Sequence, residues 1–118
     1  MRYFMRPDER DTAYLWDMLQ AARDIVLFVD GKTFNQFEKD KLTRFAVERQ
    51  LLVIGEAAHH LSAGFQNGHP DIPWNRIIGL RNILAHDYGE ILTERVWFTA
   101  IRHIPELIAQ LVPLVPEK

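Results

Sequence analysis

The sequence predicts an all-α fold, an antiparallel up-and-down bundle of four to five helices, with residues 1–118 forming one domain. Apolar residues recur at spacings of three and four over long stretches, which is the period of an amphipathic helix. No stretch alternates with the two-residue period of a strand. A chain of 118 residues has room for one core, and 47% hydrophobic residues are enough to fill it.

The first half of the chain predicts two long helices. The first runs from about Pro7 to Asp30 and stops at Gly31, a residue type that tolerates the left-handed conformation at a helix end. Asn35 followed by Glu38 resembles a capping box, and the helical period then holds from Leu42 to about Phe65. The apolar arc of this second helix is wide, which predicts that it contacts several neighbours and forms the spine of the bundle.

Breaker residues divide the second half. Pro73 is suited to the first position of a third helix, which we expect to reach His86 or Tyr88 and to end at Gly89. A fourth helix is expected to open at Thr93 and Glu94. Pro105 lies inside this last helix and predicts a kink or a break into two pieces, because proline removes a backbone donor and clashes with the preceding turn.

Composition excludes several classes of function. A net charge of −2 and a pI near 6.2 argue against a global basic field, so any contact with RNA must be local. The absence of cysteine excludes disulfides and thiolate metal sites and fits a reducing compartment, with the cytoplasm as the expected location. No apolar run approaches a membrane span or a signal peptide.

The chemically richest stretch runs from Arg81 to Tyr88 and also contains Asn82, His86 and Asp87. Histidine can give and take a proton near neutral pH, and arginine offers a fork of donors suited to a phosphate. Together they suit phosphodiester cleavage, in which histidine deprotonates a ribose 2'-hydroxyl and arginine stabilises the growing charge. This route requires no metal and leaves a 2',3'-cyclic phosphate.

The spacing complicates this picture. Arg81 and His86 are five residues apart, so they lie about 140° apart around an ideal helix, whereas Asn82 and His86 share a face. Three explanations stay open: Arg81 reaches around, the helix ends early, or a second subunit completes the site.

The pattern Arg81, four residues, His86, one residue and Tyr88 resembles the Arg-x4-His-x-Tyr motif of HepT-like toxins, a family of the HEPN superfamily. The flanking runs 72–74 and 78–86 are similar to that family as well. The resemblance implies a metal-independent ribonuclease without a cofactor, acting on RNA as a homodimer whose two copies line one cleft.

Roles for single residues follow from the same resemblance. His86 would be the general base or acid, Arg81 the phosphate anchor and Asn82 a polar supporter. Asp87 departs from the pattern of the family, and two roles stay open for it: it orients His86 or lies in water. The implied partner is an MntA-like nucleotidyltransferase antitoxin that transfers AMP to Tyr88. Adding a bulky anion two residues from His86 would block the cleft and repel RNA.

Other residues have competing interpretations. Glu56 projects from an apolar helix and is predicted either to pair with a cation such as Arg81 or to be solvated. A metal site at Glu56, His59 and His60 is not favoured, because no His-Glu-x-x-His pattern supports it. The tryptophans are expected to fill the core rather than to stack on bases. Two alternatives to the ribonuclease stay open: a non-catalytic HEPN-type module that binds a nucleotide or a protein, and a plain dimeric scaffold.

Overall fold

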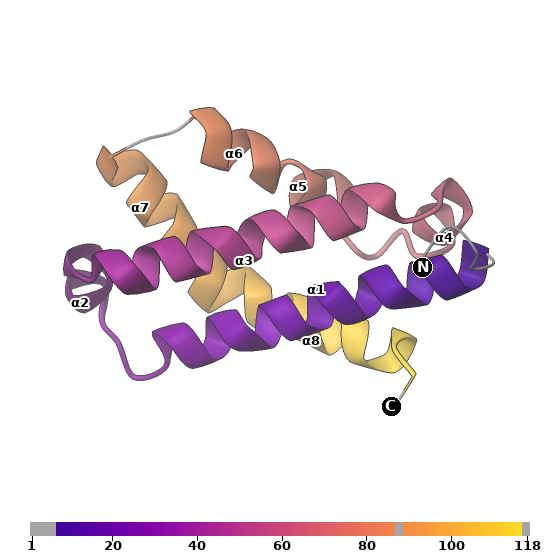
Figure 1. Ribbon diagram of the computed structural model, residues 1–118, viewed down its shortest axis with the longest axis horizontal. Coiled ribbons are helices and arrows are strands. Elements are labelled where there is room, and N and C mark those ends of the chain that lie inside the picture. Colours follow the sequence, from indigo (N-terminus) through magenta and orange to yellow (C-terminus); the bar gives the residue numbers. More distant parts are fainter. Residues whose placement is uncertain (1–6, 87–88, 117–118) are drawn as a thin grey trace.

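A computed structural model describes residues 7–86 and 89–116, and every regular element within these ranges is helical (Figure 1). The predicted all-α fold is therefore confirmed. The elements are α1 (Pro7–Val29), α2 (Phe34–Lys39), α3 (Lys41–His60), α4 (Ala63–Gly68), α5 (Trp74–Ile78), α6 (Leu80–His86), α7 (Gly89–Phe98), a π-helical segment (Thr99–His103), α8 (Ile104–Leu111) and a 3-10 turn (Val112–Leu114).

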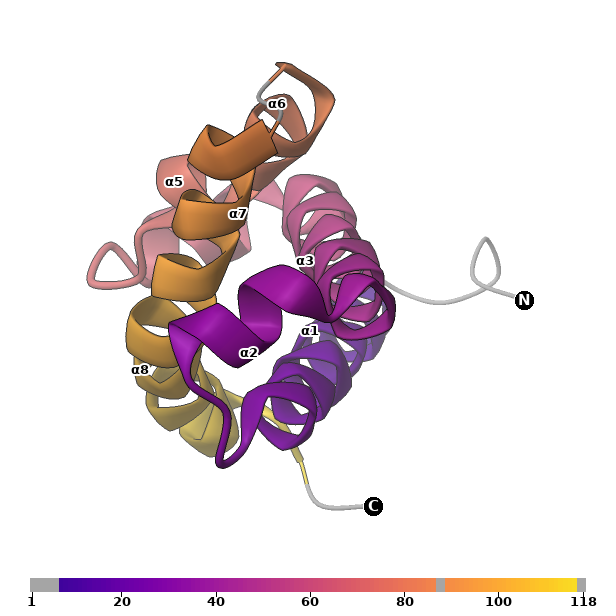
Figure 2. The same cartoon turned by 90° about the vertical axis from the view of Figure 1, so that its left-hand side faces the viewer.

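Helix α3 is the spine that the sequence predicted. It packs along α1 on one side and against α5 and α6 on another, and it also touches α2 and α7. In Figure 1, α6, α3 and α1 follow one another from top to bottom, while α7 and α8 pass behind α3 and α1. Figure 2 looks along the bundle and shows α2 lying across its end. The core fills the space between these layers.

The core is one cluster of apolar side chains drawn from most of the helices. Its most deeply buried large members come from α1, α2, α3 and α8. They are Leu15, Met18, Ile25, Phe37, Val47, Leu51, Ile54, Ile104 and Leu111. Trp74 is buried, and Trp16 and Trp97 pack partly buried against the cluster, which confirms the core interpretation of the tryptophans. No helix in the described ranges is both long and apolar enough to span a bilayer.

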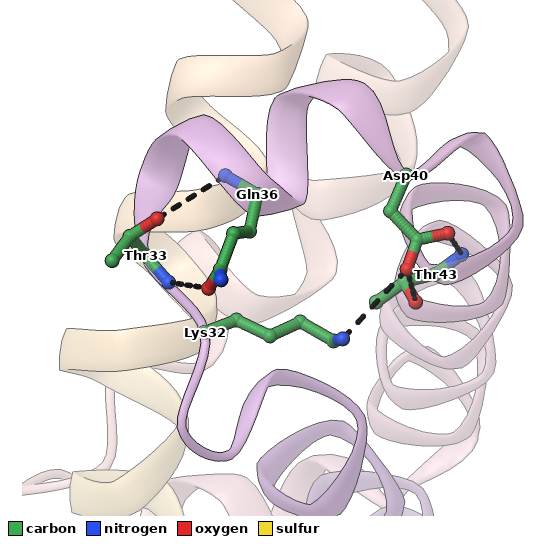
Figure 3. Close-up of polar contacts among 5 residues, drawn as sticks. All are labelled: Lys32, Thr33, Gln36, Asp40 and Thr43. Atoms are coloured by element: carbon green, nitrogen blue, oxygen red, sulfur yellow. Dashed lines mark hydrogen bonds and ion pairs between the residues drawn. The ribbon is translucent and has the colours of Figure 1, made fainter.

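The junction after α1 differs from the prediction in one detail. Gly31 has a positive φ of 72°, as a left-handed helix end requires, but the capping box is not formed by Asn35 and Glu38. The Thr33 hydroxyl accepts from the Gln36 amide at 3.2 Å, and the Gln36 side chain accepts from the Thr33 amide at 2.8 Å (Figure 3). Thr33 takes this position because the backbone there is extended, whereas Asn35 already lies inside α2.

Asp40 separates α2 from α3 and caps the spine. Its carboxylate accepts from the Thr43 amide at 3.1 Å and from the Thr43 hydroxyl at 2.6 Å, and the Lys32 ammonium lies 3.7 Å away (Figure 3). These contacts, led by the hydrogen bond from the Thr43 side chain, lower the pKa of Asp40 below its ordinary 3.8. The charged form of the cap is thus favoured in the folded state.

This cap predicts a pH-dependent stability. Because the folded pKa is lower than the unfolded one, the charge of Asp40 stabilises the fold above pH 3.8, and this contribution is lost as the pH falls through the folded pKa. Asp40→Asn should therefore lower the melting temperature at neutral pH, and this deficit should shrink as the pH falls through the folded pKa of Asp40. Thermal unfolding followed by circular dichroism measures both values. Asp30→Asn, an exposed carboxylate with no described partner, is the control; an Asp40→Asn deficit that stays constant with pH would contradict the prediction.

The predicted end of the second helix near Phe65 is wrong. Helix α3 ends at His60, and Ser62 opens the short helix α4 by accepting from the Phe65 amide. The helix ends early because two hydrogen bonds connect Ser62 to α1: the buried carboxylate of Asp11 accepts from the Ser62 amide at 2.8 Å and from its hydroxyl at 2.6 Å. These two bonds turn the chain away from the axis of α3.

The last two predicted helices are also subdivided. Gly79 separates α5 from α6, and α7 begins at Gly89, so the predicted start at Thr93 and Glu94 is wrong. Thr93 is buried inside α7 and donates its hydroxyl to the Gly89 carbonyl at 3.1 Å. Pro105 was predicted to kink the last helix or break it into two pieces, and the structure shows the α-helix interrupted there: without an amide hydrogen on Pro105, it widens into the π-helical segment before α8 resumes.

Candidate active site

Helix α6, which carries the candidate residues, packs closely against α3 at a glycine. A Cβ atom on Gly55 would lie 3.2 Å from Cγ of Arg81 and 3.3 Å from the carbonyl oxygen of Ile77. Both distances are tighter than ordinary van der Waals contact. The missing side chain at Gly55 therefore lets the α5–α6 segment lie directly on the backbone of the spine.

Arg81 uses this close approach to reach Glu56, one residue beyond Gly55. Nε of Arg81 lies 2.7 Å from Oε1 of Glu56, and the two side chains are 37% and 45% exposed. Of the two predicted environments of Glu56, the structure selects the pair with Arg81. An ion pair this exposed adds little net stability, so its main effect is to orient the guanidinium.

Asn82 and His86 project on the other side of α6, and both are exposed. Helix α6 runs unbroken from Leu80 to His86, so an early end of the helix does not explain the five-residue spacing. Arg81 turns toward α3 rather than around its own helix toward His86. Asp87 and Tyr88 lie outside the described residues.

The residues of the disfavoured metal interpretation each have other contacts. Glu56 is engaged by Arg81, while the ring of His60 stacks on Tyr14 with 5.3 Å between centroids, and His59 meets His60 edge-on. Within residues 7–86 and 89–116, no three His, Asp or Glu side chains gather to hold a metal ion. The chemical groups that the described part of the site provides are therefore the imidazole of His86, which can transfer protons, and the guanidinium of Arg81, which carries a positive charge.

A cavity elsewhere in the described part of the fold does not include Arg81 or His86. It measures about 940 Å³ and opens between the α5–α6 segment and the layer of α7 and α8. Its lining is mainly apolar and includes Leu80, Trp97 and Ile104, together with the charged side chains of Asp71, Arg76, Glu94, Arg95 and Glu106. Such a lining suits the binding of apolar groups rather than phosphodiester chemistry, so we place the candidate active site at Arg81 and His86.

Two positions that support the site escaped the sequence analysis. Gly55 carries a recognisable signal, a glycine inside an otherwise strong helical pattern, which often marks close packing of another backbone. Asp11 carries none, because its partner Ser62 is 51 residues away. Both hold the chain around the carboxyl-terminal half of α3, where Arg81 pairs with Glu56.

Comparison with known proteins identifies the family. The family described as "Ribonuclease HepT-like" matches residues 18–114. A relative from Methanocaldococcus jannaschii, named "Putative RNase MJ0127", is 37% identical over 111 residues, which are 94% of this chain and 92% of the relative. "Probable ribonuclease HepT" of Thermococcus cleftensis is 37% identical over 94 residues, which are 80% of this chain and 86% of the relative.

A third relative, "Putative RNase TTE0752" of Caldanaerobacter subterraneus subsp. tengcongensis, is 33% identical over 105 residues, or 89% of this chain and 94% of the relative. No solved structure matches the chain significantly. The family match covers the spine, the Gly55 contact and the helix that carries Arg81 and His86, and we conclude that the chain belongs to the HepT-like ribonuclease family.

Proposed function

We propose that this protein is an endoribonuclease of a toxin–antitoxin system that cleaves RNA without a metal ion and leaves a 2',3'-cyclic phosphate. The observation that carries the proposal is the arginine fixed by Glu56 on the same short helix as an exposed histidine, in a chain of a ribonuclease family. Arginine and histidine at one site are the groups that this reaction needs.

The proposed reaction uses the geometry of Arg81 directly. The bond to Glu56 engages Nε, on the stem side of the guanidinium, and the side chain keeps 37% of its surface exposed. Its terminal N–H groups can thus bind a phosphate while the carboxylate fixes the plane of the fork. Arg81 would stabilise the charge that grows on the phosphate oxygens, and Glu56 would act as a positioning residue.

His86 would carry the proton transfers. One His86 takes the proton of the ribose 2'-hydroxyl as its oxygen attacks phosphorus, and the bond from phosphorus to the 5'-oxygen breaks. The departing 5'-oxygen receives a proton from a second acid, for which the His86 of another copy is the candidate. The products are a 2',3'-cyclic phosphate and a free 5'-hydroxyl. Asn82, on the same face as His86, would support the bound RNA by hydrogen bonding, and Asp87 would orient His86.

The test is cleavage of a single-stranded RNA by purified protein in the presence of chelator. Loss of general acid–base catalysis typically costs ~10²- to 10⁴-fold in rate, so His86→Ala protein purified in parallel should be nearly inactive. Mass spectrometry of the fragments should find cyclic phosphate ends. Equal cleavage by the wild type and His86→Ala would identify a contaminant and refute the proposal.

A homodimer would explain why Arg81 and His86 point to different sides of α6. The outward stripe of α3 carries Leu42 and Phe45, which are 81% and 55% exposed, and continues through Leu52 to Glu56. Large apolar side chains exposed beside a site commonly mark an interface. Two copies related by a two-fold axis along this stripe would bury the apolar residues and bring their two sets of Arg81 and His86 together.

Phe45→Glu is therefore expected to dissociate the dimer, because two carboxylates would enter the apolar contact of a self-complementary interface. Sedimentation at micromolar concentration should show the monomer mass together with reduced RNA cleavage. Phe98→Glu is the matched control, since Phe98 is a similarly exposed phenylalanine on α7. A wild type that sediments as a monomer would contradict the dimer itself.

The proposed partner is an MntA-like nucleotidyltransferase antitoxin that silences the enzyme by transferring AMP to Tyr88. The position supports this, because Tyr88 follows His86 by two residues, and an added phosphate there would repel RNA. After incubation with ATP and the nucleotidyltransferase, the intact mass should rise by AMP units. A Tyr88→Phe protein that gains the same mass would move the modification to another residue.

A second candidate function is a non-catalytic HEPN-type module that binds a nucleotide or a protein. The cavity of about 940 Å³ between the α5–α6 segment and α7–α8 favours it, because its volume and mainly apolar lining are those of a ligand pocket. The cleavage assay separates the two functions, since a binding module would leave RNA intact at any protein concentration.

A further inference from the structure

A shallow groove between α1 and α3 adjoins the Arg81–Glu56 pair. It encloses about 230 Å³ and is lined by Tyr14 and Asp17 from α1 and by Arg49, Val53, Glu56 and His60 from α3. Glu56 belongs both to this groove and to the ion pair with Arg81. The groove is therefore continuous with the candidate active site, on the side of the spine that faces α1.

Aromatic rings form one end of the groove. Tyr14 and His60 stack with their planes 21° apart and their centroids 5.3 Å apart, and His59 meets His60 at 5.5 Å. His59 and His60 are exposed, and Tyr14 is half-buried. A row of rings that is already assembled in the protein is a platform on which a nucleobase can stack without the cost of ordering the side chains.

A cation lies at the other end. Arg49 is exposed, and its guanidinium has no hydrogen bond or ion pair with any described residue. It stands seven residues before Glu56, two helical turns away on the same stripe of α3. An arginine in this state can bind a phosphate without giving up an existing partner.

The charges of the groove narrow the class of ligand. The carboxylates of Asp17 and Glu56 line it together with Arg49, so it is not the uniformly cationic site that a compact polyanion would need. A single-stranded nucleic acid fits better, since its flat base can occupy the rings while one phosphate at a time meets Arg49.

Resting on the proposed ribonuclease function, we infer that this groove is a subsite for single-stranded RNA beside the cleaved bond. Helix α3 lies between α1 and α6 (Figure 1), so a strand whose scissile phosphate is at Arg81 would cross the spine at Glu56. Its neighbouring nucleotide then places a base on His60 and Tyr14 and a phosphate on Arg49. The stripe of the proposed dimer meets this groove at Leu52 and Glu56, so the groove would open onto the cleft shared by the two copies.

The test measures RNA binding with the full-length His86→Ala protein, which binds without cleaving. Fluorescence anisotropy with a labelled single-stranded oligoribonucleotide should give a Kd about tenfold weaker when His60→Ala is added, the usual cost of losing one base-stacking ring. Adding His60→Phe, which keeps a ring, should retain most of the affinity. Adding Arg49→Gln should weaken binding and reduce the slope of log Kd against log salt by about one.

Arg102→Gln is the matched control for Arg49→Gln, because Arg102 is an exposed arginine on the π-helical segment, outside the groove. RNA affinity that is unchanged by Arg49→Gln and His60→Ala, or reduced equally by Arg102→Gln, overturns the subsite. Absence of RNA binding by the His86→Ala protein overturns it too. So does a labelled peptide that binds in place of the oligoribonucleotide and loses affinity in the Arg49→Gln and His60→Ala variants.

Kinetics of the active protein separate the subsite from the proposed function. Arg49→Gln should raise KM and leave kcat nearly unchanged, whereas Arg81→Ala should lower kcat. Cleavage with an unaltered KM in Arg49→Gln would refute the subsite alone, while a wild type that never cleaves RNA would refute the ribonuclease.

Discussion

Gly55→Val is expected to destabilise the protein and to suppress RNA cleavage together. A Cβ atom at this position already comes within 3.2 Å of Cγ of Arg81, and the branched side chain of valine would extend further into α5 and α6. Overpacking of this kind typically costs about 1–3 kcal/mol of unfolding free energy. Urea denaturation followed by circular dichroism measures this loss.

The effect on cleavage should be larger than the loss of stability suggests. Valine would push the stem of Arg81 away from the spine, and a displacement of about 1 Å at a reacting group can cost ~10²-fold in rate. The control is Gly64→Val, because nothing lies within 4 Å of a Cβ on that helical glycine. If both valine variants unfold at the same urea concentration and cleave alike, the close approach at Gly55 has no functional consequence.

Exchanging the charges of Arg81 and Glu56 should distinguish the contribution of the ion pair to protein stability from its contribution to RNA cleavage. Each single change, Arg81→Glu or Glu56→Arg, places two like charges where atoms now lie 2.7 Å apart, and should lower the urea midpoint. The double exchange restores opposite charges and should recover the midpoint. Because both side chains are more than a third exposed, we expect these shifts to be small.

Cleavage should behave differently. Loss of a donor that stabilises transition-state charge costs ~10²- to 10³-fold, so Arg81→Glu should be nearly inactive. The double exchange should remain equally inactive, because its cation projects from α3 and no longer from the helix of His86. Recovery of cleavage in the double variant would show that the location of the positive charge is unimportant, which would contradict the proposed role of Arg81.

The parts of the fold that the sequence predicted correctly are those decided by neighbouring residues. The end of α1 follows from Gly31 two residues later, and the π-helical disturbance follows from Pro105. The end of α3 was missed because it depends on Asp11, which lies 51 residues from Ser62 along the chain. A helical pattern that continues to Phe65 gives no sign of such a tie.

The candidate site also has features that the sequence predicts and features that depend on the fold. The pair of Glu56 and Arg81 could be anticipated, because a carboxylate on an apolar helix needs either a cation or water. The direction of Arg81 could not, since it depends on how closely α6 packs on Gly55. The groove beside Tyr14 and His60 was also hidden, because its two sides come from helices whose relative placement only the fold determines.

The break at Gly79 has a consequence for how the site is maintained. It leaves Arg81 and His86 on a helix of 7 residues, too short to persist in water unless tertiary contacts hold it. Packing against α3 therefore keeps this segment helical, and α6 should unfold locally while α1 and α3 stay folded. In hydrogen exchange, its amides should lose protection well before those of α3, so that enzyme activity and global stability become separately adjustable properties of one small protein.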